Sequence, residues 1–334
     1  MRILINGLMA AIFKIFKMKI NYKSVLLLLL ASAIWGFAFV AQNIASKYLE
    51  SFTITGVRSL IGFAFLFLVA IVKSKIKKEP IFEQDKNKRK TIINASIICG
   101  TSFAFAYNFQ QFGIALYPEG TSVSGRAGFL TGLYVLFVPI ICFIFFKKKI
   151  KLNVILGLLL AVIGLYLLCF SNGISNVYLG DLIIIACGIF FALQIIFVDK
   201  YNDHIDAIKF GAWQFLVCGI LSMIMSFIFE DIIISNLIKA LPPLFYLGIC
   251  SCAVAGFLQI IGQKLSSNPT VDAIAMSFES VFAVIGGILI LHQMPLLKEV
   301  IGCFIMFIAI VLSQITFEFK KEIKKTKNIG ERHV

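Results

Sequence analysis

Long apolar segments alternate with short polar ones along almost the whole chain. The apolar segments are 24–46, 52–73, 91–116, 119–146, 152–170, 178–199, 206–229, 241–262, 269–291 and 296–317. Turn residues or lysines separate them, and no Gly/Ser-rich linker marks an appended domain. Because a helix of ~20 apolar residues crosses the hydrocarbon core of a bilayer, this pattern predicts an all-α integral membrane protein with ten spans.

The composition agrees with this pattern and excludes several classes of protein. Of 334 residues, 60% are hydrophobic and 14% charged, and the mean hydropathy is +0.95. Soluble domains have about 45–50% apolar and about 25% charged residues. The chain lacks a Gly-x-x-x-x-Gly-Lys-Ser/Thr loop and a His-Glu-x-x-His motif, and its eight cysteines all fall in apolar segments. We therefore expect neither an enzyme nor a bound metal or cofactor.

The distribution of positive charge predicts the orientation. If the N-terminus is cytoplasmic, 26 of the 31 Lys and Arg residues fall in cytoplasmic segments and 3 in external ones. Cytoplasmic loops of membrane proteins carry such an excess of Lys and Arg. We therefore expect a multi-pass protein of the cell membrane with both termini in the cytoplasm. The net charge of +14 is then explained by topology, with no nucleic-acid partner.

The two ends of the chain are basic. Residues 1–23 either form a basic amphipathic helix on the membrane surface or precede the true start, since Met18 begins a sensible chain. Ala31-Ser32-Ala33 resembles a signal-peptide cleavage site, but the apolar stretch continues through Val40, which favours a retained first helix. Residues 318–334 are expected to be a basic cytoplasmic tail.

The two halves of the chain contain similar short patterns. Gln110-x-x-Gly113 matches Gln259-x-x-Gly262 at an offset of 149, and Phe129 meets Phe278 at the same offset. Each half contains five expected helices, an odd number, so the second half enters the membrane with opposite polarity. Inverted repeats of this kind are typical of secondary transporters, whose substrate site lies near the midplane between the repeats.

Three stretches carry a resemblance to a known family. They are Ala31-Ser-Ala-Ile-Trp-Gly-Phe-Ala-Phe-Val40, the run from Gln111 through Tyr117 to Pro139, and Phe278-Glu-Ser-Val-Phe282 followed by Gly286-Gly287. They resemble the first, third to fourth and ninth helices of the drug/metabolite transporter superfamily, EamA type. The resemblance implies two inverted five-helix EamA repeats, 24–170 and 178–317. It also implies gradient-driven transport of small metabolites.

Two charged residues inside the expected spans are candidates for function, because charges within the bilayer are costly and face the bundle interior. Arg126 has small neighbours and is suited to a two-pronged hydrogen bond with a carboxylate or phosphate of a substrate. The alternatives are that its side chain reaches the outer membrane interface or pairs with Glu119. Glu279 lies near the centre of the ninth span, where burial disfavours its charged form and makes it a candidate proton carrier. A permanent salt bridge is the alternative for Glu279.

Amide and aromatic side chains complete the candidate site. The candidate substrate-binding residues are Trp35, Gln42, Tyr107, Gln110, Gln111, Arg126, Tyr134, Gln194 and Gln259. The amides either line a polar cavity or join helices to one another. By contrast, Arg58 is expected as an anchor at the membrane interface, Trp213 as a packing residue, and Asp181 and Asp272 as caps or interfacial charges.

These observations favour a secondary transporter of a small polar metabolite, such as an amino acid or carboxylate, coupled to protons or another ion. A flippase for lipids or lipid-linked headgroups is the alternative. A cationic substrate held by Trp35 and Tyr134 is the rival within the transporter hypothesis. Gly157-x-x-x-Ala161-x-x-Gly164 predicts close helix packing, either inside one chain or across a homodimer.

Overall fold

The computed structural model describes residues 22–118, 121, 123–147, 152–169, 177–202, 205–266, 269–292 and 294–314. These residues are almost entirely helical, and no strand occurs among them. The expectations for the N-terminal segment and for the C-terminal tail fall on residues 1–21 and 315–334, which lie outside the described residues.

The helices of the first half follow the expected spans. They are α2 (Tyr22–Ala45), α3 (Ser51–Lys77), α4 (Lys86–Ala115), α5 (Val123–Thr131), α6 (Tyr134–Phe146) and α7 (Leu152–Cys169). One expected span, 119–146, is divided between α5 and α6. Gly132 and Leu133 separate these two helices in a turn, and together α5 and α6 form the single span that the sequence predicted there.

The helices of the second half are α8 (Leu179–Tyr201), α9 (Ala207–Phe229), α10 (Ile234–Phe245), η3 (Tyr246–Ala255), α11 (Gly256–Leu265), α12 (Pro269–Ser277), α13 (Glu279–Leu291) and α14 (Leu297–Gln314). Segment η3 is π-helical and joins α10 to α11 without a break. The expected ninth span is divided at Phe278 into α12 and α13.

Membrane-spanning length and apolarity are evident in eight of the described helical segments, counting α5–α6, α10–α11 and α12–α13 as one each. The expected fifth and tenth spans correspond to α7 and α14, of 18 residues each. These helices are apolar on most sides because their outer faces meet lipid, whereas soluble helices keep a polar face. The chain is thus an all-helical membrane protein.

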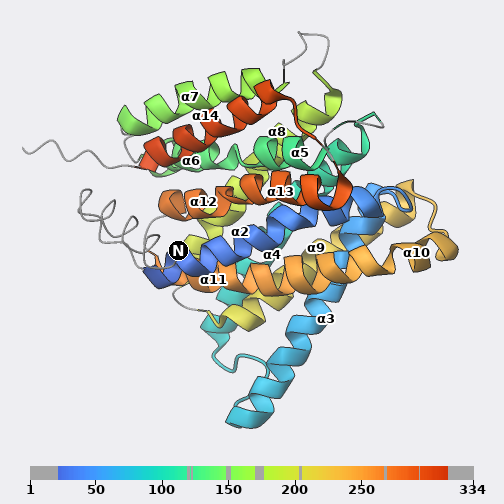
Figure 1. Ribbon diagram of the computed structural model, residues 1–334. Coiled ribbons are helices and arrows are strands. Elements are labelled where there is room, and N and C mark those ends of the chain that lie inside the picture. Colours follow the sequence, from blue (N-terminus) through green and yellow to red (C-terminus); the bar gives the residue numbers. More distant parts are fainter. Residues whose placement is uncertain are drawn as a thin grey trace, which may run out of the picture.

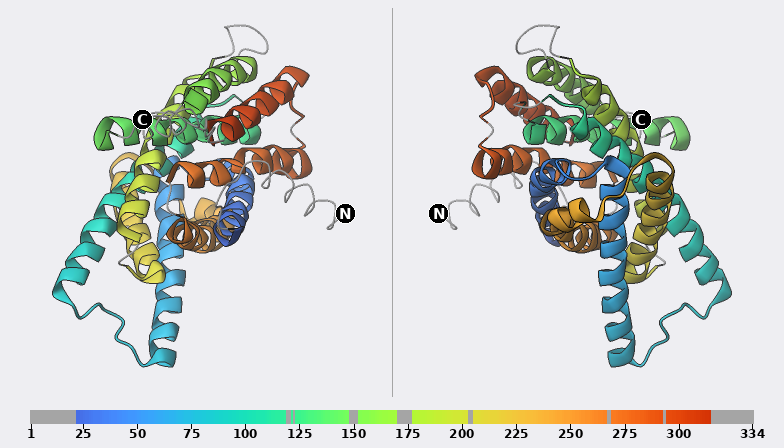
Figure 2. Two further views of the ribbon diagram at one scale, coloured as in Figure 1. Left: turned by 90° about the vertical axis from the view of Figure 1, so that its left-hand side faces the viewer. Right: turned by 90° about the vertical axis from the view of Figure 1, so that its right-hand side faces the viewer.

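Helices of one half pack mainly on helices of the other. In Figures 1 and 2, α7 and α14 lie side by side along one edge of the bundle, and α3 lies toward the opposite edge. Helix α3 packs on α9, α4 packs on α8, and α2 packs on α11 and α13. Exchanging equivalent helices between the halves leaves this set of pairs unchanged, as expected for two repeats related by a twofold axis.

Side chains near both ends of α9 hold it against α3. At one end, the Glu230 carboxylate accepts hydrogen bonds from the backbone N–H groups of Phe52 and Thr53, at 2.6 and 2.7 Å. These N–H groups lie in the first turn of α3 and have no partner within the helix. At the other end, Lys73 forms an ion pair with Asp206, which also caps the first turn of α9.

Small residues bring α2, α5 and α13 into close contact. A Cβ atom at Gly36 of α2 would lie 2.3 Å from the Cβ of Phe282 and 2.7 Å from the backbone oxygen of Glu279. A Cβ at Gly128 of α5 would lie 2.6 Å from the Cβ of Ala283. Larger side chains would therefore push α13 outward, and the position of Glu279 depends on these glycines.

Candidate functional site

A cavity lies in the middle of the bundle, between the two halves. The space between its walls amounts to at most about 460 Å³. Its walls come from most of the helices, and its lining residues are Trp35, Ala38, Phe39, Gln42, Arg58, Phe103, Tyr107, Gln110, Thr131, Tyr134, Phe191, Gln194, Ile195, Ser251, Gln259, Met276 and Glu279. An apolar pocket with a few converging polar groups is the usual form of a small-molecule site.

Most of the residues expected at the site meet in this cavity. Trp35, Gln42, Tyr107, Gln110, Tyr134, Gln194, Gln259 and Glu279 all line it. Gln111 and Arg126 are not among the lining residues. The Gln111 amide donates instead to the Ser46 hydroxyl, at 2.7 Å, and so joins α4 to the end of α2.

The Arg126 guanidinium binds a carboxylate of the protein itself. Its Nε and Nη2 donate to the two oxygens of Asp181, at 2.7 and 2.6 Å. The Tyr117 hydroxyl donates to the same carboxylate, and the Tyr178 ring lies 4.9 Å from the guanidinium carbon. Asp181 also caps α8, as expected, by accepting from the backbone N–H of Tyr178. Glu119, the other partner considered for Arg126, lies outside the described residues.

Arg58 lies in the central cavity, contrary to its expected place at the membrane interface. It is only 1% exposed, and its Nε and Nη2 have no hydrogen-bond partner. Its guanidinium carbon lies 4.0 Å from the centre of the Tyr107 ring. Among the described residues, no carboxylate lies within ion-pair distance of it. Burial of an unpaired charge is costly, so this arginine is a strong candidate for binding a ligand.

A sequence signal for Arg58 did exist. Thr55 and Gly62 lie three residues before it and four after it, which places all three on one helix face. Both neighbours are buried. An arginine that shares a helix face with small and polar residues is expected to face the bundle interior and not lipid. The prediction of an interfacial Arg58 used only its depth along the span, which carries no information about the helix face.

The two broken helices place Tyr134 and Glu279 at the cavity. Tyr134 is the first residue of α6, and Glu279 is the first residue of α13. Each follows directly on a break in the fourth span of its repeat, and the Ser280 hydroxyl joins the two regions by donating to the Gly128 carbonyl at 2.7 Å. The buried Tyr134 hydroxyl and Glu279 carboxyl lie close enough to interact with each other, but Tyr134 Oη and Glu279 Oε1 make no hydrogen bond of ordinary geometry. Discontinuous helices form the substrate sites of many transporters.

The amides in the cavity are only partly satisfied. Gln259 donates to the oxygen of Gln194 at 2.9 Å, and Gln110 donates to the Thr131 hydroxyl at 3.1 Å. Gln42 Oε1, Gln194 Nε2 and Gln259 Oε1 are buried with no partner in the protein. Buried polar groups in native proteins are normally hydrogen-bonded, so these atoms call for water or a ligand.

Two further observations limit the chemistry of the cavity. Within the part of the chain that the structure describes, no three His, Cys, Asp or Glu side chains are grouped as a metal site would require. The Trp35 indole N–H is engaged, since it donates to the Ser251 carbonyl of η3 at 3.0 Å. The unsatisfied groups among the described lining residues are thus one cation, one carboxyl, one phenol hydroxyl and several amide atoms, a set suited to reversible binding of a polar solute.

Comparisons with known proteins agree with this arrangement. The model of the EamA-like transporter family matches residues 22–170 and again 178–314. An uncharacterized transporter of Archaeoglobus fulgidus is 26% identical over 292 residues, which cover 85% of this chain and 83% of the relative. The uncharacterized transporter YoaV of Bacillus subtilis is 24% identical over 298 residues, with 86% and 95% of the two chains covered.

A solved crystal structure has the same fold. It superimposes with a TM-score of 0.65, covers 88% of this chain and 97% of its own, and is 15% identical in sequence. At this identity the likeness supports the fold alone. The family match extends over both halves of the chain, and the relatives that match most of its length are transporters. The chain belongs to the EamA-like transporter family.

Proposed function

We propose that the protein is a secondary transporter of a small metabolite that carries a carboxylate, with amino acids as the preferred class. The observation that supports this substrate class is Arg58, a buried cation in the cavity that has no described carboxylate within ion-pair distance. A guanidinium presents a planar fork of donors that matches a carboxylate. A substrate carboxylate there supplies the missing counter-charge and the missing acceptor together.

The rest of the cavity suits the ammonium end of an amino acid. Gln42 Oε1, Gln259 Oε1 and Glu279 Oε1 are acceptors without donors. Among the described residues, no lysine or arginine other than Arg58 lines the cavity. A zwitterion thus satisfies both the unpaired cation and the unpaired acceptors, whereas a purely cationic substrate leaves Arg58 uncompensated.

Arg126 has a different role in this proposal from the one expected from the sequence. Its guanidinium is already held by both oxygens of Asp181. We assign it to positioning α5 against α8, and assign the substrate carboxylate to Arg58. Gln111 likewise positions α4 against α2.

Glu279 is the proposed proton carrier. Its carboxyl is buried, lines the cavity and begins the second segment of a broken helix. A change in water access to the cavity during transport changes how readily this carboxyl holds a proton. Proton movement is thereby coupled to the substrate site, in a cell membrane with both termini of the chain in the cytoplasm.

The test is ligand binding and uptake by wild type, Arg58→Gln and Arg58→Lys. We expect neutral amino acids or small carboxylates, but not cationic amines, to raise the melting temperature of the purified wild type. Losing a buried charged hydrogen bond costs ~2 kcal/mol or more, so Arg58→Gln is expected to bind roughly 30-fold more weakly. Arg58→Lys keeps the positive charge but loses the planar pair of donors, so its affinity for the ligand is expected to lie between those of the wild type and Arg58→Gln.

The matched control changes a polar residue of similar burial that does not line the cavity, Gln111→Leu. It is expected to retain the ligand-induced shift, and uptake into proteoliposomes should follow the same order. Unchanged binding in Arg58→Gln, or stabilisation by cations alone, contradicts the proposal. Translocation of labelled phospholipid without uptake of any small solute would instead support a flippase.

A further inference from the structure

A second cavity lies at the end of the bundle where α3 ends and where α4 and α9 begin, and it shares no lining residue with the central cavity. Lysines are concentrated in these segments, and we call this end the lysine-rich end. The cavity is bounded by the first turns of α4, by the first half of α9 and by the connection 78–85. The space between its walls, which is open to one side, amounts to at most about 840 Å³, against 460 Å³ for the central cavity. Apolar side chains form most of its walls, chiefly Phe82, Ile92, Ile93, Trp213, Leu216 and Val217. The proposed transport function makes no use of it.

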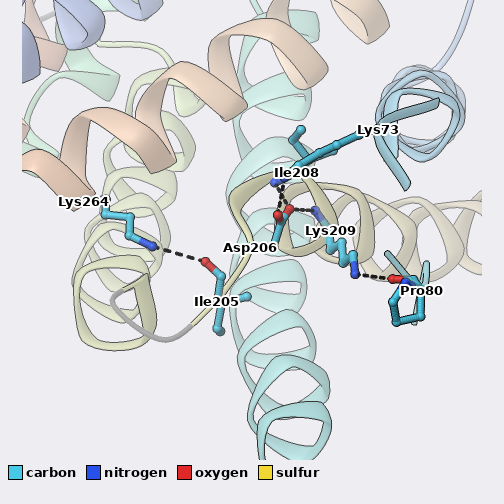
Figure 3. Close-up of polar contacts among 7 residues, drawn as sticks. All are labelled: Lys73, Pro80, Ile205, Asp206, Ile208, Lys209 and Lys264. Atoms are coloured by element: carbon cyan, nitrogen blue, oxygen red, sulfur yellow. Dashed lines mark hydrogen bonds and ion pairs between the residues drawn. The ribbon is translucent and has the colours of Figure 1, made fainter. Parts of the chain in front are cut away.

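The connection 78–85 is folded back over this groove and held there. Lys209 at the start of α9 donates to the Pro80 carbonyl at 3.0 Å, and next to it Asp206 binds Lys73 of α3, as Figure 3 shows. The Phe82 ring stacks on Trp213, with centroids 6.2 Å apart. These contacts hold the groove in a defined shape, with the ring of Trp213 on its wall.

Two cations lie at the rim of the groove. Arg89 is in the first turn of α4 and Lys209 in the first turn of α9. Neither forms an ion pair with a described carboxylate. Glu83 also lines the groove, and its Oε1 accepts from the backbone N–H of Asp85 at 3.2 Å. The N-termini of α4 and α9 lie at the same end, but their partial positive charge is already met by the capping carboxylates of Asp85 and Asp206, so Arg89 and Lys209 carry the positive charge of the rim.

A neutral polar group lies deeper in the groove. The Ser96 hydroxyl is 2% exposed and has no hydrogen-bond partner. On the outer side, Ile93 and Ile97 of α4 are each 50% exposed, in a helix long and apolar enough to span the membrane. The groove thus passes from a cationic rim, past a free hydroxyl, to an apolar wall that faces the acyl chains of the bilayer.

We propose that this groove binds one anionic phospholipid from the leaflet at the lysine-rich end. The phosphate lies between Arg89 and Lys209, an ester oxygen accepts from Ser96, and one acyl chain covers Trp213 and Ile92. Basic pockets between membrane-spanning helices bind anionic headgroups in this way. The positive charge of the rim favours an anionic lipid over a neutral detergent. The apolar wall of the groove favours a molecule with an acyl chain over a soluble anion.

The test uses Trp213 as an internal reporter. The chain has two tryptophans, so Trp35→Phe leaves Trp213 as the sole source of indole fluorescence. The purified variant is titrated, in mixed micelles, with phosphatidylglycerol or phosphatidylcholine whose acyl chains carry bromine, which quenches indole on contact. We expect half-maximal quenching at a lower concentration of phosphatidylglycerol than of phosphatidylcholine. Each rim charge that contacts the phosphate is expected to contribute a difference of up to about five-fold.

Charge variants in the same background decide between the groove and general attraction. Arg89→Gln with Lys209→Gln is expected to abolish the preference for phosphatidylglycerol. The matched control, Lys75→Gln with Lys77→Gln, removes two exposed lysines at the same end that do not line the groove and should keep the preference. A preference that survives the rim variant, or is lost equally in the control, overturns the proposal. Trp213 that neither lipid quenches also overturns it, and indicates that another occupant, such as a second copy of the chain, covers the groove.

Discussion

The two buried arginines of the bundle have opposite surroundings. Arg126 meets both oxygens of Asp181 and lies against the rings of Tyr178 and Tyr117. Arg58 is buried more completely, yet only the Tyr107 ring faces its charge, in a cavity with unpaired amide atoms. A buried charge that is fully paired fixes structure, whereas one left unpaired keeps its binding capacity for a ligand. The depth of an arginine in the membrane therefore does not identify it as ligand-binding. What identifies it is whether the protein itself supplies a carboxylate partner.

The largest expected effect comes from breaking the paired site. Arg126→Gln leaves the Asp181 carboxylate buried without its cation, which costs about 3–5 kcal/mol of unfolding free energy. We expect a strongly lowered melting temperature in detergent. The double variant Arg126→Gln with Asp181→Asn removes both charges and should recover much of the loss. No recovery in the double variant would show that the pair is not the source of the effect.

The same substitution at the unpaired site is expected to act in the opposite direction on stability. Arg58→Gln removes an uncompensated buried charge, so the ligand-free protein should melt at an unchanged or higher temperature. Its ligand-induced shift should nevertheless be much smaller than that of the wild type at the same ligand concentration. A ligand-free Arg58→Gln protein that is as unstable as Arg126→Gln would mean that Arg58 has a structural partner after all, and the contrast between the two sites would fail.

A smaller effect is expected from the ring that faces Arg58. The guanidinium lies 4.0 Å from the Tyr107 centroid, close enough for a cation–π interaction of roughly 0.5–2 kcal/mol. Tyr107→Leu should lower the melting temperature in the wild-type background. In the Arg58→Gln background the same change should lose most of that effect, since the cation is gone. Equal effects in both backgrounds would assign the role of Tyr107 to packing alone.

The smallest effect is expected at an exposed ion pair, between Lys73 and Asp206 at the end of the bundle. Both side chains are about one-third exposed, at 32% and 31%, and such pairs contribute about 0–1 kcal/mol. Partial burial alone raises the pKa of Asp206, which precedes α9. Hydrogen bonds from Lys73 and from the backbone of Lys209 and Ile208 outweigh it, so the pKa lies below its ordinary value of 3.8.

A lowered pKa fixes the pH at which this contribution disappears. The contribution is fully present above pH 3.8, where Asp206 is ionised in the folded and unfolded chain, and is lost as pH falls through the lower folded value. Melting temperatures of wild type and Asp206→Asn should therefore differ slightly at pH 6 and converge below about pH 4. A gap that widens on acidification would contradict this assignment.

Much of the fold follows from the sequence. The apolar segments predicted the helix starts closely in α2, α8 and α9, whereas α4 begins at Lys86, ahead of the predicted 91. The breaks at Gly132–Leu133 and at Phe278 were not predicted, because a turn inside an apolar segment leaves hydropathy unchanged. What stabilises those breaks is contact between helices, such as the Ser280 hydroxyl on the Gly128 carbonyl.

The candidate site was partly predictable for the same reason. Glu279 and the amides stand out because polar side chains are rare in spans, and eight of the expected residues line one cavity. Which arginine faces that cavity was not predictable from depth. Asp181 lies 55 residues from Arg126 in the chain and becomes its partner only when α8 packs on α5.

The sequence by itself determined the class of protein, the number and order of the expected spans and the repeat, because each depends on local apolarity and on residue spacing along one helix. Only the tertiary structure decided which polar groups are satisfied by the protein and which remain free. That distinction depends on packing between helices of opposite halves, which pairs Arg126 with Asp181 and leaves Arg58 unpaired in the cavity. The sequence shows where each arginine charge is, but whether the folded protein neutralises that charge depends on which residues lie beside it in space.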